Sequence, residues 1–313
     1  MHQTTLKKYQ TRARNFYRKY CGSNTPNSAQ ICTALLARAH ELQPNSFSTL
    51  KSALLNDQLA QGNLKAAQAV RALINPVTAP GSEFPRKPKQ RGVRTISDDD
   101  FWQLVVHLRA HDFYDEALCV VLAYYTGVRP CEMRTITVTG DHVDIIGGKK
   151  AEKLERGADR TLVIEHPEML KAITEAAQWM SNCPRTNSAI RDRLRKECRT
   201  LWPRRKQHPT LKSFRHQLGS NLKASGEGDE SLAYIMGHQS TDSINVYGDR
   251  RSGAGRTVYV RAAAGADLSK VRKPKKPALF GRGQVVGRIE IPISLSSRPT
   301  AARATTSSTD VSG

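Results

Sequence analysis

The spacing of apolar residues predicts a helical first part of the chain. Over residues 5–75, apolar side chains recur three or four positions apart, the spacing of one helix face, and Pro44 and Gly62 interrupt the pattern. The residues that carry it are Leu35, Leu36, Leu42, Leu50, Leu54, Leu55, Leu59, Leu64, Val70, Leu73 and Ile74. We therefore expect a helical N-terminal domain over residues 1–75.

A segment that cannot form a core follows. Residues 76–96 combine several prolines with the basic residues Arg86, Lys87, Lys89, Arg91 and Arg94. This composition is typical of an extended chain whose charges remain in water. We interpret residues 76–96 as a basic linker and as the main domain boundary.

Helical patterns resume after the linker. Ser97 followed by three aspartates is typical of a helix start, because serine caps free amides and acids favour the positive end of the helix. Gly127 ends the second helix, and Pro130 favours the first turn of a third that runs through Glu132 and Met133. The expected helices cover 98–110, 113–126, about 167–181, 186–200, 210–224, 229–236 and 241–248.

Two short runs have the alternation of strands instead. Residues 142–146 and 160–164 are rich in valine and isoleucine, and a polar loop with Lys149 and Lys150 joins them. We expect a β-hairpin or small antiparallel sheet with a basic tip, within a fold that is otherwise mainly α. Residues 261–313 are rich in alanine, serine, proline and basic residues, which predicts a basic, largely disordered tail.

The charge of the chain points to a polyanionic partner. Lysine and arginine number 49 against 28 acids, a formal net charge of +21. Residues 1–96 have a net charge of +12 and residues 261–313 of +7, whereas the centre has only +2. A nearly neutral centre between basic flanks is typical of a folded catalytic domain, 97–260, whose neighbours grip a nucleic acid backbone.

Several classes of protein are disfavoured. No apolar run approaches the ~20 residues that cross a bilayer, and the polar N-terminus has no hydrophobic signal core. We therefore expect a cytoplasmic, DNA-associated protein without a membrane contact. No His/Cys pair has metal-ligand spacing and no Cys-x-x-Cys occurs, so we expect neither a metal nor another cofactor.

Four residues in the central region suit attack on a phosphodiester. They are Arg129 in Thr-Gly-Val-Arg-Pro-Cys-Glu, Arg215 in Lys-Ser-Phe-Arg-His, His238 after Gly237, and Tyr247. Guanidinium groups match phosphate oxygens and stay charged, and a tyrosine hydroxyl can act as nucleophile. Each motif alone is more often a surface pair, a helix cap or a packed side chain.

The order of these motifs resembles the catalytic domain of the tyrosine recombinases, the phage-integrase family. The resemblance covers about residues 97–255 and includes Arg-x-x-Glu, a basic hairpin, Lys-x-x-Arg-His, Gly-His and a tyrosine nine residues later. It implies a helical catalytic domain with a small three-stranded sheet, preceded by a helical core-binding domain in residues 1–75. It also implies double-stranded DNA as substrate, a homotetramer on paired sites, and accessory DNA-bending or directionality factors.

The resemblance implies a role for each matching residue. Arg129 and Arg215 would hold the scissile phosphate, His238 would bind it, and Tyr247 would attack, leaving a 3′-phosphotyrosyl link without metal or ATP. A hairpin lysine would protonate the leaving 5′-oxygen. Lys150 is the first choice, with Lys149 and Lys153 as alternatives.

One motif departs from the family pattern. Its second motif usually begins with histidine where this chain has Lys212, so the acceptor of the tyrosine proton stays open. We expect a site-specific recombinase or integrase, such as that of a mobile element. The alternatives are relaxation of DNA like that of a type IB topoisomerase, and a catalytically silent DNA-binding regulator.

Overall fold

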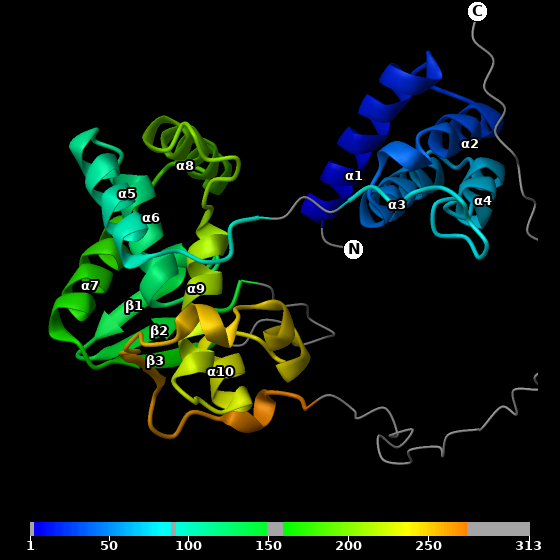
Figure 1. Ribbon diagram of the computed structural model, residues 1–313. Helices are drawn as coiled ribbons and strands as arrows, with labels where there is room; N and C mark the ends of the chain where they lie inside the picture. The colour runs from blue at the N-terminus through cyan, green and yellow to red at the C-terminus, as the bar shows by residue number, and fades with distance from the viewer. Residues whose placement is uncertain (1–2, 89–91, 149–158, 274–313) are drawn as a thin grey trace, which may run out of the picture.

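The computed structural model describes residues 3–88, 92–148 and 159–273 of the chain (Figure 1). Within these ranges two separate clusters of buried apolar side chains form. One is built from residues between Ala13 and Val77, and the other from residues between Ile96 and Val271. No helix in the described ranges is both long and apolar enough to cross a membrane.

The N-terminal cluster lies among four helices. They are α1 (Gln3–Phe16), which continues as the π-helical turn η1 (Tyr17–Cys21), α2 (Ser28–Ala37), α3 (Pro44–Ala60) and α4 (Leu64–Ala72). Local signals fix their ends: Asn27 and Gln30 form a capping box at α2, and Pro44 occupies the first turn of α3. Phe16, Ile31 and Leu54 are buried where the helices meet.

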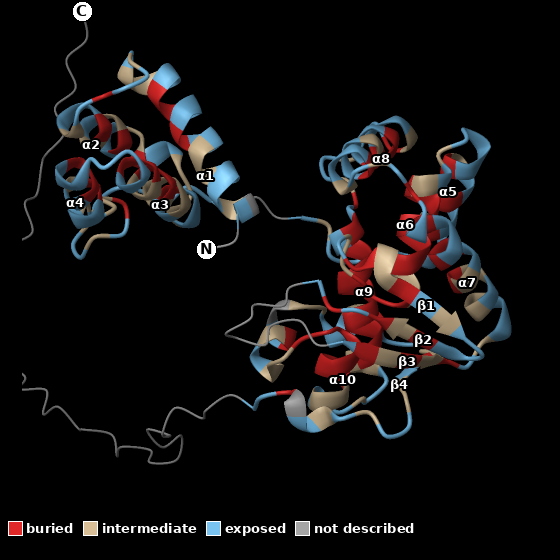
Figure 2. Cartoon of the chain, turned by 180° about the vertical axis from the view of Figure 1, so that it is seen from behind, coloured by how far each residue is buried: buried red, intermediate tan, exposed pale blue. Residues whose placement is uncertain are grey.

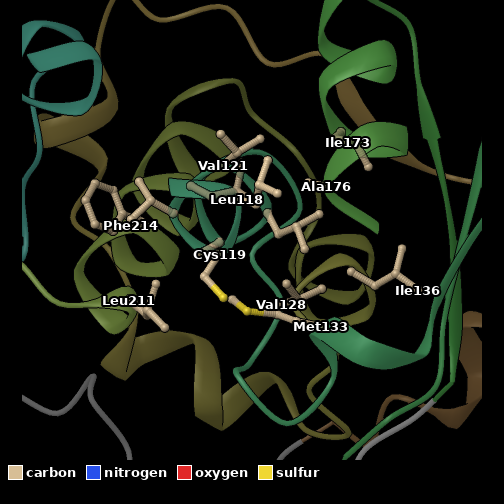
Figure 3. Packing of buried hydrophobic residues seen from close by; sticks show 14 of the residues in the cluster. Leu118, Cys119, Val121, Val128, Met133, Ile136, Ile173, Ala176, Leu211 and Phe214 are labelled. Atoms are coloured by element: carbon tan, nitrogen blue, oxygen red, sulfur yellow. The ribbon is translucent and has the colours of Figure 1, made fainter. Parts of the chain in front are cut away.

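The second cluster is organised around α6 (Tyr114–Tyr125), which is buried over most of its length. Around it lie α5 (Asp98–Ala110), α7 (Pro167–Ser181), α8 (Asn187–Leu201), α9 (Leu211–Ala224) and α10 (Asp229–Ile235). Leu118 and Val121 of α6 are buried in one cluster with Phe214 of α9 and Ala176 of α7 (Figure 3). Figure 2 shows α9 and α10 as mostly buried.

A small antiparallel sheet completes this part. Its order is β1-β2-β3-β4, with bounds Ile136–Thr139, His142–Ile145, Arg160–Ile164 and Val260–Ala262. The expected hairpin is confirmed as β2 and β3, in which Val143 pairs with Leu162. The sheet has four strands instead of three, because Val260–Ala262 returns to pair with the free edge of β3.

The folded chain also continues beyond residue 260, where we placed the start of the tail. After β4 the 3-10 turn η6 (Leu268–Lys270) forms, and Val271 is buried in the second cluster. Arg272 then pairs with Ser240 in a parallel bridge. Residues 274–313, the rest of the expected tail, lie outside the described residues.

Two expected helices are wrong. After Pro130 the chain makes a tight turn closed by Glu132, then the 3-10 turn η3 (Met133–Thr135), and enters β1 at Ile136. The segment 241–248 forms the 3-10 turn η4 (Thr241–Val246), after which Tyr247 has extended backbone angles. The Lys223 ammonium binds the carbonyls of Ile244 and Gly248, so these groups face α9 instead of continuing a helix.

Candidate active site

A buried carboxylate organises the first motif. Oε1 of Glu132 accepts a hydrogen bond from the Arg129 guanidinium at 2.6 Å, and Oε2 accepts from the Arg129 backbone amide at 2.9 Å. Oε2 also accepts from Arg160 at 3.0 Å. Burial would raise the pKa of Glu132, but the charges of Arg160 and Arg129 outweigh it and lower the pKa to about 2. Glu132 is therefore ionised and fixes the direction of Arg129.

Arg129 ends the Thr-Gly-Val-Arg turn, and its side chain reaches the Gly-His turn. Its Nη2 donates to the carbonyl of Gly237 at 2.9 Å, and its side chain is 17% exposed. Because Arg129 is already held on two sides, it presents its guanidinium at a defined place without needing a ligand. Part of it reaches solvent, as an anion-binding group must.

Arg215 and His238 form the second part of the site. Arg215 donates to the carbonyls of Gly127 and Met236, and its Nη2 lies 2.9 Å from Nε2 of His238. A guanidinium only donates, so Nε2 of His238 is the acceptor and the ring proton lies on Nδ1. Burial and the charges of Arg215 and Arg129 lower the pKa of His238 to about 3, so the imidazole is neutral at physiological pH.

Tyr247 packs against the same group through its ring. Its ring packs edge-on to His238 with centroids 4.8 Å apart and stacks on His216 at 4.6 Å. The Arg215 guanidinium carbon lies 5.2 Å from the centre of the Tyr247 ring. The structure thus brings together Arg129, Arg215, His238 and Tyr247, four residues that the sequence spreads over more than a hundred positions.

Lys212 lies at the rim of the same site. It is exposed at the start of α9, and its Nζ is 5.7 Å from the centre of the Tyr247 ring. His216, one turn further along α9, is buried and accepts from the Gly248 amide at 3.4 Å through Nδ1. Burial and nearby cations, with Lys212 first among them, lower the pKa of His216 to about 4. His216 therefore supports Tyr247 as a neutral ring.

The hairpin lysines complete the list of expected site residues. Lys149, Lys150 and Lys153 all lie outside the described residues. The segment that leads to them is described as far as Gly148, whose amide lies 3.4 Å from Oε1 of Glu132. The hairpin therefore leaves the sheet beside the carboxylate that holds Arg129.

Arg160 is a site residue that the sequence interpretation missed. It begins β3, its side chain is fully buried, and it contacts the Glu132 carboxylate. A signal was present: in the strand 160–164, alternation places Arg160 on the same face as Leu162 and Ile164. A charged residue on a core face needs a partner of opposite charge, and Glu132 is that partner.

The charges of this site favour an anion. Arg129 and Arg160 contact Glu132, Arg215 lies close to both arginines, and both histidines are neutral, so the cluster has a formal charge of +2. Burial keeps water from screening this charge. A phosphodiester that acquires a second negative charge during substitution would gain stabilisation from the arrangement. Within the described ranges, no three His, Cys, Asp or Glu side chains are placed to hold a metal ion.

The fold resembles that of solved integrases. A lambda integrase dimer bound to a COC′ core site aligns with a TM-score of 0.56 and 16% identity, over 82% of this chain and 74% of that chain. A lambda integrase tetramer bound to a Holliday junction gives 0.54 and 14%, with the same coverage. The Tn1549 transposon integrase with circular intermediate DNA gives 0.54 and 12%, over 80% and 90%.

Sequence comparison adds no relative to these structures. No family model matches the sequence, and no match was found among curated proteins. The likeness is therefore one of fold, and it extends over 82% of this chain for the lambda integrase dimer and 80% for the Tn1549 integrase. The chain has the fold of the integrases of phage lambda and Tn1549.

Proposed function

We propose that this protein is a site-specific DNA recombinase that cuts and rejoins strands through a covalent 3′-phosphotyrosyl intermediate. The observation that carries the proposal is the position of Tyr247, whose ring contacts His216 and His238 and lies beside Arg215. A phenol held against a dry, cationic cluster suits attack on phosphorus better than a role in packing alone.

The chemistry follows from the charges. Arg129 and Arg215 hold the scissile phosphate, and His238 donates to it through the proton on Nδ1. The Tyr247 hydroxyl attacks phosphorus, a phenolic O–P bond forms, and the bond to the 5′-oxygen breaks. A hairpin lysine, Lys150 or its neighbours Lys149 and Lys153, supplies the proton of the leaving hydroxyl. Reversal with the 5′-hydroxyl of another strand rejoins the DNA, with no net loss of phosphodiester bonds.

Removal of the tyrosine proton requires a base near the ring. His216 and His238 have lowered pKa values and weak basicity, and both use a ring nitrogen to accept an internal hydrogen bond. Lys212 is the remaining candidate, because its ammonium lies close to the ring and positive charge beside a phenol favours the phenolate. We assign Lys212 either as the proton acceptor, which requires its neutral amine form, or, as an ammonium, as the charge that favours the phenolate.

The parts of the chain outside the catalytic domain would bind DNA. We assign residues 1–75 as a core-binding domain, 76–96 as a basic linker, 97–260 with its extension to Val271 as the catalytic domain, and the rest as a basic tail. Basic residues of α1, such as Lys7, Lys8 and Arg12, are exposed and can contact phosphates. By analogy with the lambda integrase tetramer on a Holliday junction, the active assembly would be a homotetramer on two duplexes.

The proposal is tested with a duplex that carries a nick close to the cleavage point. Loss of the short 5′-hydroxyl fragment prevents rejoining and traps the covalent complex. Candidate duplexes come from the DNA that flanks the coding sequence. The wild-type protein should form a protein–DNA adduct that survives denaturation, and Tyr247→Phe should form none while still binding the duplex. An adduct of equal yield in Tyr247→Phe would refute the assigned nucleophile.

A second assay separates recombination from relaxation. A plasmid with two target sites should yield recombinant products, whereas a topoisomerase-like enzyme would change only its supercoiling. A protein that binds the duplex with no adduct and no product would be a silent DNA-binding regulator.

A further inference from the structure

Arg160 has an unusual environment for a guanidinium group. Its side chain has no exposed surface, and its Nη2 donates to Oε2 of Glu132 at 3.0 Å. Its Nε and Nη1 atoms are buried and have no hydrogen-bond partner among the described residues. Burying a charged group in this way is costly, and apolar residues often replace buried ion pairs without loss of stability. Stability alone therefore gives a poor reason for an arginine here.

The guanidinium of Arg160 lies directly against the Gly237–His238 turn. Gly237 has a φ of +59°, and a β-carbon at this position would lie 2.8 Å from the guanidinium carbon of Arg160 and 3.3 Å from Nη1 of Arg129. Real β-carbons do not approach a heavy atom as closely as 2.8 Å, so a side chain at position 237 would have to displace the Arg160 guanidinium. The turn that presents His238 thus rests on Arg160.

Arg160 also shares the charge of Glu132 with Arg129. Without Arg160, the guanidinium of Arg129 would be the one cation paired with Glu132 within the described residues. A phosphate would then compete with Glu132 for the same guanidinium. With Arg160 in place, the cluster keeps the excess positive charge that a phosphate can bind.

We propose that Arg160 is a positioning residue for the reaction: it ties Glu132 to the Gly237–His238 turn, so that Arg129 and His238 meet the phosphate at a fixed separation. The proposal rests on the proposed function and adds a residue to it. Arg160 does not touch the substrate, because its free nitrogen atoms are shielded from solvent. Its effect should therefore appear in the rate of cleavage and not in the affinity for DNA.

The first test compares Arg160→Met, which keeps length and loses charge, with Arg160→Lys, which keeps the charge. With the nicked duplex, the dissociation constant and its salt dependence should match those of the wild-type protein, since no phosphate contact is lost. The rate of adduct formation should fall about 100-fold in Arg160→Met, the effect of a small misplacement in a site of this kind, and recover in part in Arg160→Lys. Cleavage at the wild-type rate by Arg160→Met would overturn the proposal.

A pair of glycine variants tests the contact without removing Arg160. Gly237→Ala places a methyl group against the guanidinium, whereas Gly226→Ala adds the same methyl at a φ of +84° with open space around it. Both variants acquire the same kind of backbone strain, but only Gly237→Ala should slow adduct formation strongly. Equal rates in the two variants would overturn the proposal. This test can be made even if Arg160→Met does not fold.

The outcomes also separate this inference from the function on which it rests. If the wild-type protein forms no adduct with any duplex it binds, the proposed function fails and the role of Arg160 fails with it. If the wild-type protein and the Arg160 and Gly237 variants all form the adduct at one rate, the function stands and only the role of Arg160 is wrong.

Discussion

The imidazole of His216 stacks on the ring of Tyr247, with an angle of 26° between the planes. His216 is held in turn by the Gly248 amide, so the residue after the tyrosine fixes the ring beneath it. His216, which follows Arg215, therefore positions Tyr247, the proposed nucleophile, from α9. Tyr247 needs this support, because it lies beyond the end of η4 on extended backbone.

Acid should destabilise the protein through His216. Its pKa is lowered to about 4 from an ordinary value near 6.5, so the unfolded state binds the proton more readily. The contribution to stability is complete above pH 6.5 and is lost as the pH falls toward 4. Urea unfolding at pH 7 and pH 5 should show a loss that is smaller in His216→Phe, which keeps the stack, by on the order of 1–2 kcal/mol.

The matched control for this titration is His40→Gln, because His40 is exposed. It should lose stability between pH 7 and pH 5 as the wild-type protein does. An equal loss in His216→Phe and in the wild-type protein would show that His216 is not the group that titrates.

Removing the charge of Glu132 should destabilise the fold. Glu132→Gln leaves Arg129 and Arg160 without their shared counter-ion in a buried site. The expected loss in the free energy of unfolding is about 3–5 kcal/mol, measured by urea unfolding. Glu175→Gln is the control, since its pair with Arg109 is exposed and should contribute less than about 1 kcal/mol. Similar losses in both variants would contradict the central role of Glu132.

Gly248 should be intolerant of a side chain. Its φ is +68°, and a β-carbon would lie 2.6 Å from the backbone carbon of Gly219 in α9, where neither side can move aside easily. Gly248→Ala should push the Tyr247 segment away from α9 and lower the yield of adduct at least tenfold, with DNA binding retained. Gly255→Ala, at φ +75° with open space, should cleave normally. Loss of adduct in both variants would indicate backbone strain alone.

The leaving-group proton identifies the catalytic lysine. Lys149→Ala, Lys150→Ala and Lys153→Ala are compared on a normal duplex and on one with sulfur in place of the bridging 5′-oxygen at the cleavage point. A thiolate leaves without a proton, because thiols have a pKa near 8.5. The variant that lacks the acid should cleave slowly on the normal duplex and at the wild-type rate on the sulfur duplex, and we expect Lys150→Ala to be that variant. Equal slowing of Lys150→Ala on both duplexes would exclude it.

Much of the fold could be predicted because its signals are local. Ser97 marks a helix start that the structure reproduces at residue 98, and the helix expected over about 167–181 is found as α7. The strand β4 could not be predicted, because three residues with one valine have no periodic pattern and form a strand only against the edge of β3. The end of η4 could not be predicted for the same reason. It depends on the contacts of Lys223 with Ile244 and Gly248, which no local sequence pattern indicates.

The site was predictable to the extent that its residues belong to motifs. Arg129, Arg215, His238 and Tyr247 lie together as an ordered set of motifs indicates, and their proposed roles remain to be tested. Arg160 belongs to none of the motifs quoted above. Its pairing with Glu132 joins two segments of the chain that come together only in the folded structure. The alternation of β3 indicates that Arg160 faces inward, but its partner can be identified only from the folded structure.

The central claim is that Tyr247 becomes covalently joined to the 3′ end of a cleaved strand. The most direct measurement traps the adduct on a nicked duplex, digests protein and DNA, and locates the modified peptide by mass spectrometry. We predict one modified peptide, containing Tyr247 with a nucleotide attached through its 3′-phosphate, and a free 5′-hydroxyl on the released fragment. Attachment at another residue, or through a 5′-phosphate, would contradict the account.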